Sequence, residues 1–262
     1  MRRMTLLLTC LLMALSINAA GTNHFPRISE KAETGYFPLS QSAIYLDTED
    51  YKVVGITAGM LSDDVERVTG SRPAVQPAKG LKRIPNGPAV VIGTIGHSRL
   101  IDELIKLKAI DVSEIRGKWE SFIITTVNNP KTDGPLLVIA GSDRRGTAFG
   151  LTSLSEAIGV SPWYWWADVP VEHDPSPMYG ENYMSDEPSV KYRGLFINDE
   201  DWGMKTWSER NFEKELGDIG PKTYDKVCEL LLRLKANMVA PAMHTCTGAF
   251  YSHPESQVMA DK

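Results

Sequence analysis

The stretch Leu136-Leu-Val-Ile-Ala-Gly-Ser-Asp-Arg-Arg-Gly146 begins with five apolar residues and turns directly into polar ones. Such an apolar run next to turn residues is typical of a strand. Ser142 or Asp143 can cap a helix that continues to about Ile158 and ends at Gly159. A strand that leads at once into a helix is typical of an α/β fold.

The same alternation extends toward the amino terminus. Strands are predicted at residues 43–46, 89–93 and 122–127, and amphipathic helices at residues 50–69 and from Ser98, the predicted helix cap, onward. Together they predict an α/β sandwich domain of normal size over residues 21–171.

Two arginines and two glycines lie in the first two turns of the helix that follows residue 142. Gly146 and Gly150, one turn apart, allow its backbone to lie close against the sheet. Arg144 and Arg145 could instead hold an anion at the helix start. A lone arginine pair is a weak signal for a ligand, so capping and packing are the preferred interpretation.

The first twenty residues form a segment of their own. A basic start, Met1 to Met4, precedes an apolar run from Thr5 to Ile17. The run is too short to span a membrane, and this order predicts a signal peptide over residues 1–20 and export to the periplasm or the cell exterior.

After the predicted signal peptide only Cys228 and Cys246 remain, which excludes a disulfide framework. Cys228 is predicted to be a small buried residue of a helix.

Charge narrows the class of partner. The 28 Lys and Arg residues are outnumbered by 33 Asp and Glu residues, which leaves a net charge of -5. A chain with no basic surplus is not expected to bind nucleic acid.

The alternation of strand-like and helix-like segments stops after residue 171. Residues 172–190 contain Pro175, Pro177 and Gly180, show no periodicity and are predicted to be a linker. Residues 193–197, 221–235 and 238–243 then predict a strand, a helix and a second strand. A (β/α)₈ barrel needs about 250 residues, so residues 191–262 are interpreted as the start of a truncated TIM barrel.

Polar side chains follow both strands of this second unit. In a parallel sheet, ligands bind at the carboxyl ends of the strands. The predicted substrate-binding residues are Asn198, Asp199, Glu200, Asp201, Trp202 and His244. Neither zinc nor calcium spacing is present around them, so no metal is expected.

Four consecutive aromatic residues, Trp163 to Trp166, precede the linker. They cannot all point inward from one segment. Trp163, Trp165 and Trp166 are therefore predicted either to stack on a glycan or to form a seam between the two domains.

Five segments together resemble glycoside hydrolase family 115, whose members are xylan α-glucuronidases. The segments are Gly141-Ser-Asp-Arg-Arg-Gly146, Gly159-Val-Ser-Pro-Trp-Tyr-Trp-Trp-Ala-Asp-Val-Pro170, Tyr192-Arg-Gly-Leu-Phe-Ile-Asn-Asp-Glu-Asp-Trp-Gly203, Gly217-Asp-Ile-Gly-Pro221 and Lys235-Ala-Asn-Met-Val-Ala-Pro-Ala-Met-His244. Their order covers nearly the whole mature chain and implies the amino-terminal portion of such an enzyme.

The resemblance implies an inverting enzyme that removes glucuronic acid, or its 4-O-methyl ether, from glucuronoxylan or aldouronic acid oligosaccharides. Inversion uses a general acid and a general base, and the resemblance places both beyond Lys262, so the 262-residue chain is expected to be inactive alone. No cofactor is expected. A homo-oligomer of the full-length protein is compatible with the sequence. The alternative is a non-catalytic glycan-binding protein that uses the aromatic cluster at residues 163–166.

Overall fold

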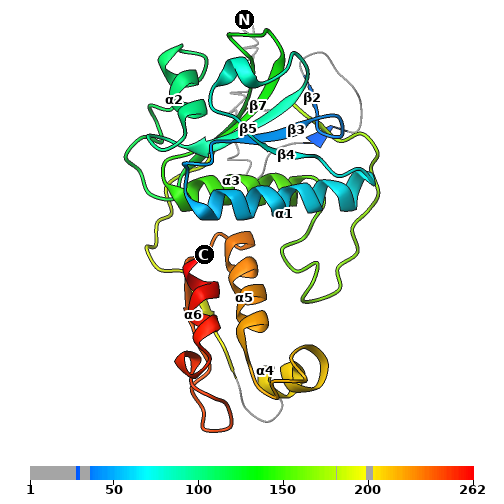
Figure 1. The fold of residues 1–262 in the computed structure, drawn as a ribbon, viewed down its shortest axis with the longest axis vertical. Coiled ribbons are helices and arrows are strands. Elements are labelled where there is room, and N and C mark those ends of the chain that lie inside the picture. The colour runs from blue at the N-terminus through cyan, green and yellow to red at the C-terminus, as the bar shows by residue number, and fades with distance from the viewer. Residues whose placement is uncertain (1–27, 30–35, 181, 199–202) are drawn as a thin grey trace, which may run out of the picture.

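The chain folds into two units, a layered α/β unit and a smaller unit that extends away from it (Figure 1). The structure is a computed structural model that describes residues 28–29, 36–180, 182–198 and 203–262. The predicted signal peptide, residues 1–20, lies outside the described residues, so its prediction stays as it is.

A six-stranded mixed sheet forms the middle of the first unit. Its order is β4-β3-β5-β7-β6-β9, in which β4, β3, β5 and β7 are parallel, and β6 runs antiparallel to both β7 and β9. The strands are β3 (Ala43–Leu46), β4 (Val75–Pro77), β5 (Ala89–Thr94), β6 (Phe122–Asn128), β7 (Pro135–Gly141) and β9 (Tyr183–Met184). The apolar run at residues 136–140 therefore lies in a central strand, β7, with neighbouring strands on both sides.

Helices cover both faces of this sheet. Helices α1 (Lys52–Thr69) and α3 (Arg144–Ala157) lie side by side on one face, and α2 (Arg99–Lys106) lies on the other, beyond a short 3₁₀ turn at Leu81–Arg83. This is the predicted α/β arrangement, because each face of the sheet buries its own apolar core against helices.

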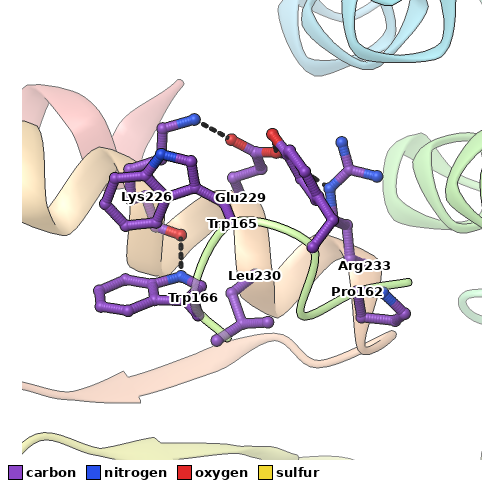
Figure 2. Close-up of a pocket in the computed structure, with 8 residues that line it drawn as sticks. Pro162, Trp165, Trp166, Lys226, Glu229, Leu230 and Arg233 are labelled. Atoms are coloured by element: carbon purple, nitrogen blue, oxygen red, sulfur yellow. Dashed lines mark hydrogen bonds and ion pairs between the residues drawn. The ribbon is translucent and has the colours of Figure 1, made fainter. Parts of the chain in front are cut away.

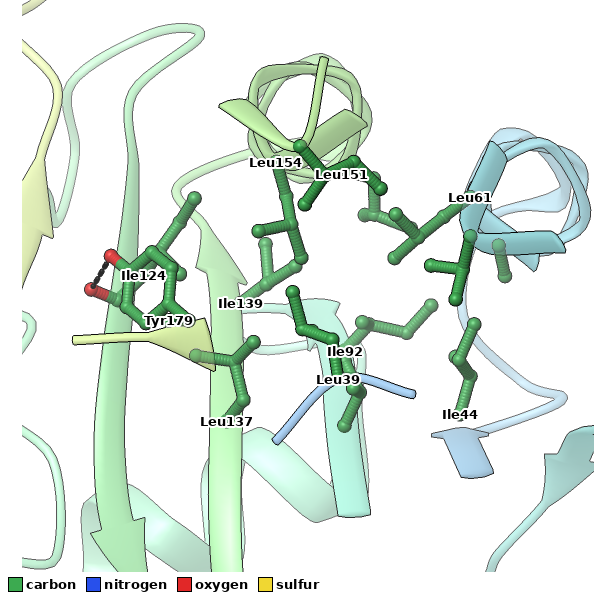
Figure 3. Packing of buried hydrophobic residues seen from close by; sticks show 14 of the residues in the cluster. Leu39, Ile44, Leu61, Ile92, Ile124, Leu137, Ile139, Leu151, Leu154 and Tyr179 are labelled. Carbon is green, nitrogen blue, oxygen red and sulfur yellow. Dashed lines mark hydrogen bonds between the residues drawn. The ribbon is translucent and has the colours of Figure 1, made fainter. Parts of the chain in front are cut away.

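The core under α1 and α3 is shown in Figure 3. Leu61 of α1 and Leu154 of α3 point toward Ile92 and Ile139 of the central strands. All four side chains are almost completely buried. Burial of a large aliphatic side chain contributes about 1.5–3 kcal/mol, so this layer holds the two helices on the sheet.

The start of α3 matches the capping prediction. Asp143 is the N-cap residue, and its carboxylate accepts a hydrogen bond from the Gly146 N–H at 2.7 Å. A Cβ atom on Gly146 would collide with the Ser121 carbonyl oxygen, and one on Gly150 would lie 2.6 Å from a methyl group of Ile139. Close packing of these two glycines is thereby confirmed.

The cap of α2 differs from the prediction. Ser98 occupies the N-cap position, but its hydroxyl makes no capping hydrogen bond. The Asp47 carboxylate instead accepts from the Arg99 N–H at 3.0 Å and from the Arg99 guanidinium at 2.6 Å. A carboxylate from a neighbouring strand end satisfies the helix start better than the short serine side chain does.

The segment predicted as a linker, residues 172–190, carries two short strands. Strand β8 (Met178–Tyr179) lies between β1 (Ile28–Ser29) and β2 (Phe37–Pro38) in a three-stranded antiparallel sheet, and β9 joins the edge of the large sheet. Tyr179 is fully buried, and its hydroxyl donates to the Ile124 carbonyl oxygen at 3.2 Å. Part of the segment therefore packs onto the first unit.

The second unit is built on a strand, a helix and a strand. Strands β10 (Gly194–Phe196) and β11 (Met238–Ala240) pair in parallel, and α5 (Pro221–Arg233) connects them. The further elements are α4 (Met204–Trp207), a π-helical turn (Ser208–Phe212), a 3₁₀ turn (Phe250–Ser252) and α6 (Pro254–Asp261). A third apolar core, with Ile197, Tyr224 and Leu231, lies under α5.

Strand β11 is shorter than predicted. The expected strand ran to Met243, whereas the observed one ends at Ala240, directly before Pro241. Proline has no N–H to donate, so the hydrogen-bond ladder stops there.

The terminal helix α6 was not predicted, because only Val258 and Met259 interrupt its polar sequence with large apolar side chains.

Candidate functional site

The parallel pairing of β10 and β11 brings two polar connections to one end of the second unit. Phe196 is opposite Ala240, and the Ile197 N–H continues the ladder to the Ala240 carbonyl oxygen at 2.9 Å. Asn198 comes directly after Ile197, whereas His244 lies four residues beyond the end of β11, and both are exposed. Helix α5 runs back toward the six-stranded sheet, so β10 and β11 run in the opposite direction. Their carboxyl ends therefore lie on the side of the second unit that faces away from that sheet (Figure 1).

Backbone hydrogen bonds shape the turns that carry these two residues. The Asn198 carbonyl oxygen accepts from the Met204 N–H at 3.0 Å, and the His244 carbonyl oxygen accepts from the Thr247 N–H at 3.2 Å. The other predicted substrate-binding residues, Asp199, Glu200, Asp201 and Trp202, lie outside the described residues. Of the predicted set, the structure thus describes Asn198 and His244, each in the connection that follows one of the two parallel strands.

Glu213, which the sequence analysis did not single out, fills the amino-terminal end of α5. Its buried carboxylate accepts from the backbone N–H groups of Gly220, Lys222 and Thr223 at 2.8–3.1 Å, and from the Thr223 hydroxyl at 2.6 Å. A helix start is a natural anion site. Here the protein supplies the anion itself, so this terminus is already satisfied.

Asp218 is a second carboxylate near the same end. It accepts from the Ile219 N–H at 2.8 Å, from the Gly248 N–H at 2.8 Å and from His253 Nε2 at 3.0 Å. Burial alone would raise the pKa of Asp218, but these hydrogen bonds and the nearby imidazole outweigh burial and lower it. The carboxylate therefore stays ionised and joins the α5 connection to the one that carries His244.

The aromatic residues 165 and 166 contact the second unit. Trp165 packs edge-on against Trp166, Trp207 and Phe212, with ring centroids 4.9–5.8 Å apart. The Trp166 indole N–H donates to the Lys226 carbonyl oxygen at 3.3 Å. Such edge-to-face contacts each contribute about 0.5–1.5 kcal/mol beyond area burial, so these two rings have partners at the boundary between the units.

Tyr164 lies deeper in the same boundary. The guanidinium groups of Arg67 and Arg233 are each 4.7 Å from its ring centroid, and its hydroxyl donates to Glu229 at 2.9 Å. Burial raises the pKa of this phenol. Arg233 also donates to Asp64 of α1 at 2.7 and 3.1 Å, and both side chains are buried.

Figure 2 shows the shallow hollow between this segment and α5. Trp165 and Trp166 lie beside Lys226, while Glu229 and Arg233 line the other part. The Lys226 ammonium lies 5.2 Å from the Trp165 ring. The side chains of the hollow thus bond mainly to one another. Trp163 differs, because 42% of it is exposed.

Among the residues that the structure places, no three His, Cys, Asp or Glu side chains gather as a metal-holding group. Within the same ranges, no helix has the length and apolar character that crossing a bilayer requires.

Comparison with known proteins connects these strand ends to a family. The family described as Glycosyl hydrolase family 115 matches residues 185–262, which contain β10, α5, β11 and both polar connections. A solved family 115 4-O-methyl-α-glucuronidase with specificity for decorated arabinogalactans is 36% identical over 86% of this chain, with a TM-score of 0.71. The chain belongs to glycoside hydrolase family 115.

The match to that family 115 structure covers 28% of its length, so this chain corresponds to a minor part of the longer relative. The predicted family resemblance is confirmed, and so is a mixed α/β architecture. No curated protein matches the sequence.

Two further structures are similar over 82% of this chain. An N-acetyl-β-hexosaminidase from Streptomyces plicatus is 15% identical, and the chain covers 32% of it; a family 20 β-N-acetylhexosaminidase from Streptomyces coelicolor is 12% identical, with 33% covered. Both have a TM-score of 0.44.

Proposed function

We propose that this chain is part of an exported α-glucuronidase, which hydrolyses the bond between glucuronic acid, or its 4-O-methyl ether, and a decorated plant polysaccharide. The observation that carries the proposal is the parallel β10–β11 pair inside the family 115 segment, with Asn198 and His244 in the connections that follow its two strands. Glycosidases built on parallel strands bind their substrates at such ends.

The first question for an assay is which polysaccharide backbone carries the uronic acid that the enzyme removes. The family resemblance favours glucuronoxylan, with cleavage at the 1,2-linkage to xylose. The solved relative is specific for decorated arabinogalactans, which makes that backbone the second substrate to test. Both carry the same type of terminal uronic acid, so we expect the same uronate pocket in either case.

The proposed chemistry is inversion by two carboxyl groups on opposite faces of the sugar, typically about 6.5–9.5 Å apart. We assign the general acid and base to parts of the full-length protein beyond Lys262, in keeping with the 28% coverage of the relative. The pocket residues proposed here are Asn198, Asp199, Glu200, Asp201, Trp202 and His244. Their amide, carboxylate and imidazole groups suit hydrogen bonds to sugar hydroxyls.

The second unit is proposed to open a (β/α)₈ barrel, over residues 191–262, after the α/β domain at 21–171 and the connection at 172–190. The sheet face that carries Phe196 and Met238 supports this, because both side chains are exposed. Parallel strands are normally buried on both faces, and further barrel strands would cover this one.

Export to the periplasm or the cell exterior is proposed from the basic start and the apolar run within residues 1–20. That location suits an enzyme whose substrate is a polysaccharide. Sequencing the amino terminus of the secreted protein tests this, and a mature protein that begins at Met1 would refute it.

The test of the site uses the full-length enzyme with aldouronic acid oligosaccharides and decorated arabinogalactan. We expect His244→Ala and Asn198→Ala each to lower kcat/KM roughly 10- to 100-fold, the effect of losing one or two hydrogen bonds to substrate. His173→Ala is the matched control, because His173 is an exposed histidine of the other unit. Unchanged kcat/KM in both site variants would refute the assignment, and release of no uronic acid by the wild type would refute the function.

The inactivity of the 262-residue chain is a separate expectation. We expect no release of 4-O-methylglucuronic acid from aldouronic acids by this chain, and any measurable release would contradict the placement of the acid and base. Glycan binding without catalysis is the alternative, and only the exposed ring of Trp163 favours it. Binding of the chain to glucuronoxylan that is lost in Trp163→Ala would support that alternative.

A further inference from the structure

We propose that Asp218 and His253 are positioning residues for the connection at residues 241–253, which carries His244. Through them, the β10–α5 connection would hold the His244 backbone at the strand ends. The consequence for activity rests on the proposed function, whereas the positioning itself does not.

The contacts place one carboxylate between two separate segments. Oxygen Oδ2 of Asp218 accepts from the Gly248 N–H at 2.8 Å and from His253 Nε2 at 3.0 Å. Gly248 is four residues after His244, and His253 precedes α6. The middle and the end of the His244 connection are therefore attached to one atom of Asp218.

The start of the same connection is attached to α5. The Ala242 N–H donates to the Tyr224 hydroxyl at 3.2 Å, and the Tyr224 ring packs edge-on against Phe250 at 4.7 Å. His244 thus lies between one attachment at residue 242 and a second at residue 248. Loss of the second would leave it on a longer and looser loop.

Asp218 itself is anchored. Its carbonyl oxygen accepts from the Ser208 hydroxyl at 2.7 Å, and this hydroxyl lies 2.9 Å from that of Thr223. The Thr223 hydroxyl donates to Glu213, the carboxylate that fills the start of α5. Contacts through these two hydroxyls thus connect a helix terminus to Asp218, which gives the rigid base that a positioning residue needs.

Packing at Gly248 is an independent sign of this close approach. A Cβ atom at this position would lie 2.7 Å from Oδ2 of Asp218 and 2.8 Å from the Ser252 hydroxyl. Real Cβ atoms do not approach other atoms so closely, so a side chain at this position would displace the Asp218 carboxylate or the Ser252 hydroxyl.

The ionisation of Asp218 agrees with this geometry. Burial by itself raises its pKa, yet the hydrogen bonds from His253, Gly248 and Ile219 lower it overall. The acceptor is a carboxylate, and bonds to a charged acceptor are stronger than those to a neutral one.

The experiment uses the full-length protein with Asp218→Asn, His253→Ala and His253→Gln. Asparagine keeps the size of Asp218 but has one acceptor oxygen, so it cannot satisfy both Ile219 and Gly248. We expect Asp218→Asn to speed amide hydrogen exchange in a peptide covering 241–253 by about tenfold or more, the loss of a charge-assisted hydrogen bond. Exchange in residues 89–94 of β5 is the folding control and should stay unchanged.

The histidine pair separates positioning from general stability. The glutamine side chain has a donor nitrogen where histidine has Nε2, so His253→Gln should keep wild-type exchange while His253→Ala should resemble Asp218→Asn. In the activity assay, Asp218→Asn and His253→Ala should raise KM about tenfold with kcat nearly unchanged, because a displaced His244 weakens sugar binding.

Three results have distinct meanings. Exchange in 241–253 that matches wild type in both Asp218→Asn and His253→Ala would overturn the positioning. Faster exchange with unchanged KM would overturn the link to sugar binding. A wild-type enzyme that releases no uronic acid would refute the proposed function, and the exchange data would still decide whether Asp218 holds the connection.

Discussion

Glu120 provides the sharpest test of how the two units are held together. Its carboxylate accepts from Arg145 Nε at 2.5 Å, from Arg193 Nη2 at 2.5 Å and from Asn237 Nδ2 at 2.8 Å. Arg145 opens α3, whereas Arg193 and Asn237 lie directly before β10 and β11. One side chain of the first unit therefore fixes the amino ends of both parallel strands of the second.

The perturbation is Glu120→Gln, which keeps the shape but removes the charge and one acceptor. The new amide nitrogen would face a guanidinium donor. The Glu120 side chain is 0% exposed, whereas those of Arg145 and Arg193 are 38% and 24% exposed. Removing one partner of a fully buried pair costs about 3–5 kcal/mol; because both arginines remain partly solvated, we expect a loss of about 2–3 kcal/mol.

The assay is urea unfolding of the 262-residue chain, followed by tryptophan fluorescence and circular dichroism. Glu156→Gln is the matched control, since Glu156 is bonded to Lys235 across the same boundary at 2.6 Å but is partly exposed. We expect the control to lose less than about 1 kcal/mol.

The pH dependence gives a second readout for Glu120→Gln. Burial alone would raise the Glu120 pKa, but the hydrogen bonds from Asn237, Arg193 and Arg145 outweigh it and lower the pKa. A lowered folded-state pKa stabilises the protein above the unfolded value, about 4.3 for glutamate, and this contribution is lost as pH falls through the folded value. The difference between wild type and variant should therefore be constant near pH 7 and shrink on acidification.

Two results would refute the reasoning. One is a Glu120→Gln midpoint shift no larger than that of Glu156→Gln. The other is a stability difference that stays the same when the pH is lowered.

Three further predictions concern other parts of the fold. Arg233→Met should lower the free energy of unfolding in urea by about 3 kcal/mol, because it leaves the Asp64 carboxylate buried without its main partner. Adding Asp64→Leu should recover most of this loss. A double variant as unstable as the single one would contradict this. Burial raises the pKa of the Cys228 thiol to about 11. At pH 8 this thiol should therefore react with iodoacetamide roughly a hundredfold more slowly than an ordinary thiol, whereas exposed Cys246 should react readily. Mass spectrometry of the two cysteine-containing peptides measures both rates. Gly150→Ala should destabilise the chain by about 1–3 kcal/mol despite better helix propensity, because the new methyl would overpack β7; a raised melting temperature would contradict it.

The elements that the sequence predicted well are those with strong local patterns. Strand β3 was predicted with its observed limits, and the limits of α1, β5, β6, β7 and α3 differ by at most two residues. Each has either a continuous apolar run or a helical period, together with a cap or a glycine at its end. Gly70, for example, ends α1 with φ 75° and donates to the Glu66 carbonyl oxygen.

The short strands could not be found in this way. Strands β1, β8 and β9 have two residues each, too few to show any alternation. They exist because edges of neighbouring strands offer unpaired backbone groups. Tyr179 illustrates the point, since its burial depends on β6 rather than on its own neighbours in sequence.

The candidate site divides in the same manner. The positions of Asn198 and His244 after strands were visible in the sequence, because apolar runs end just before them. Asp218, His253 and Glu213 carried no comparable signal: each acts through a hydrogen bond to a residue 7–35 positions away. The aromatic segment was visible as well, but the contacts of Trp165 and Trp166 with Trp207, Phe212 and Lys226 depend on the tertiary structure.

By itself the sequence determined the α/β class, the family, the order of the main elements and the two polar strand ends, because periodicity, caps and motifs are local properties. Only the tertiary structure decided which charges meet. Asp64 and Arg233 are 169 residues apart, and Glu120 and Arg193 are 73 apart. Such pairs form when packing brings two surfaces together and removes water from them, and no local pattern records that event.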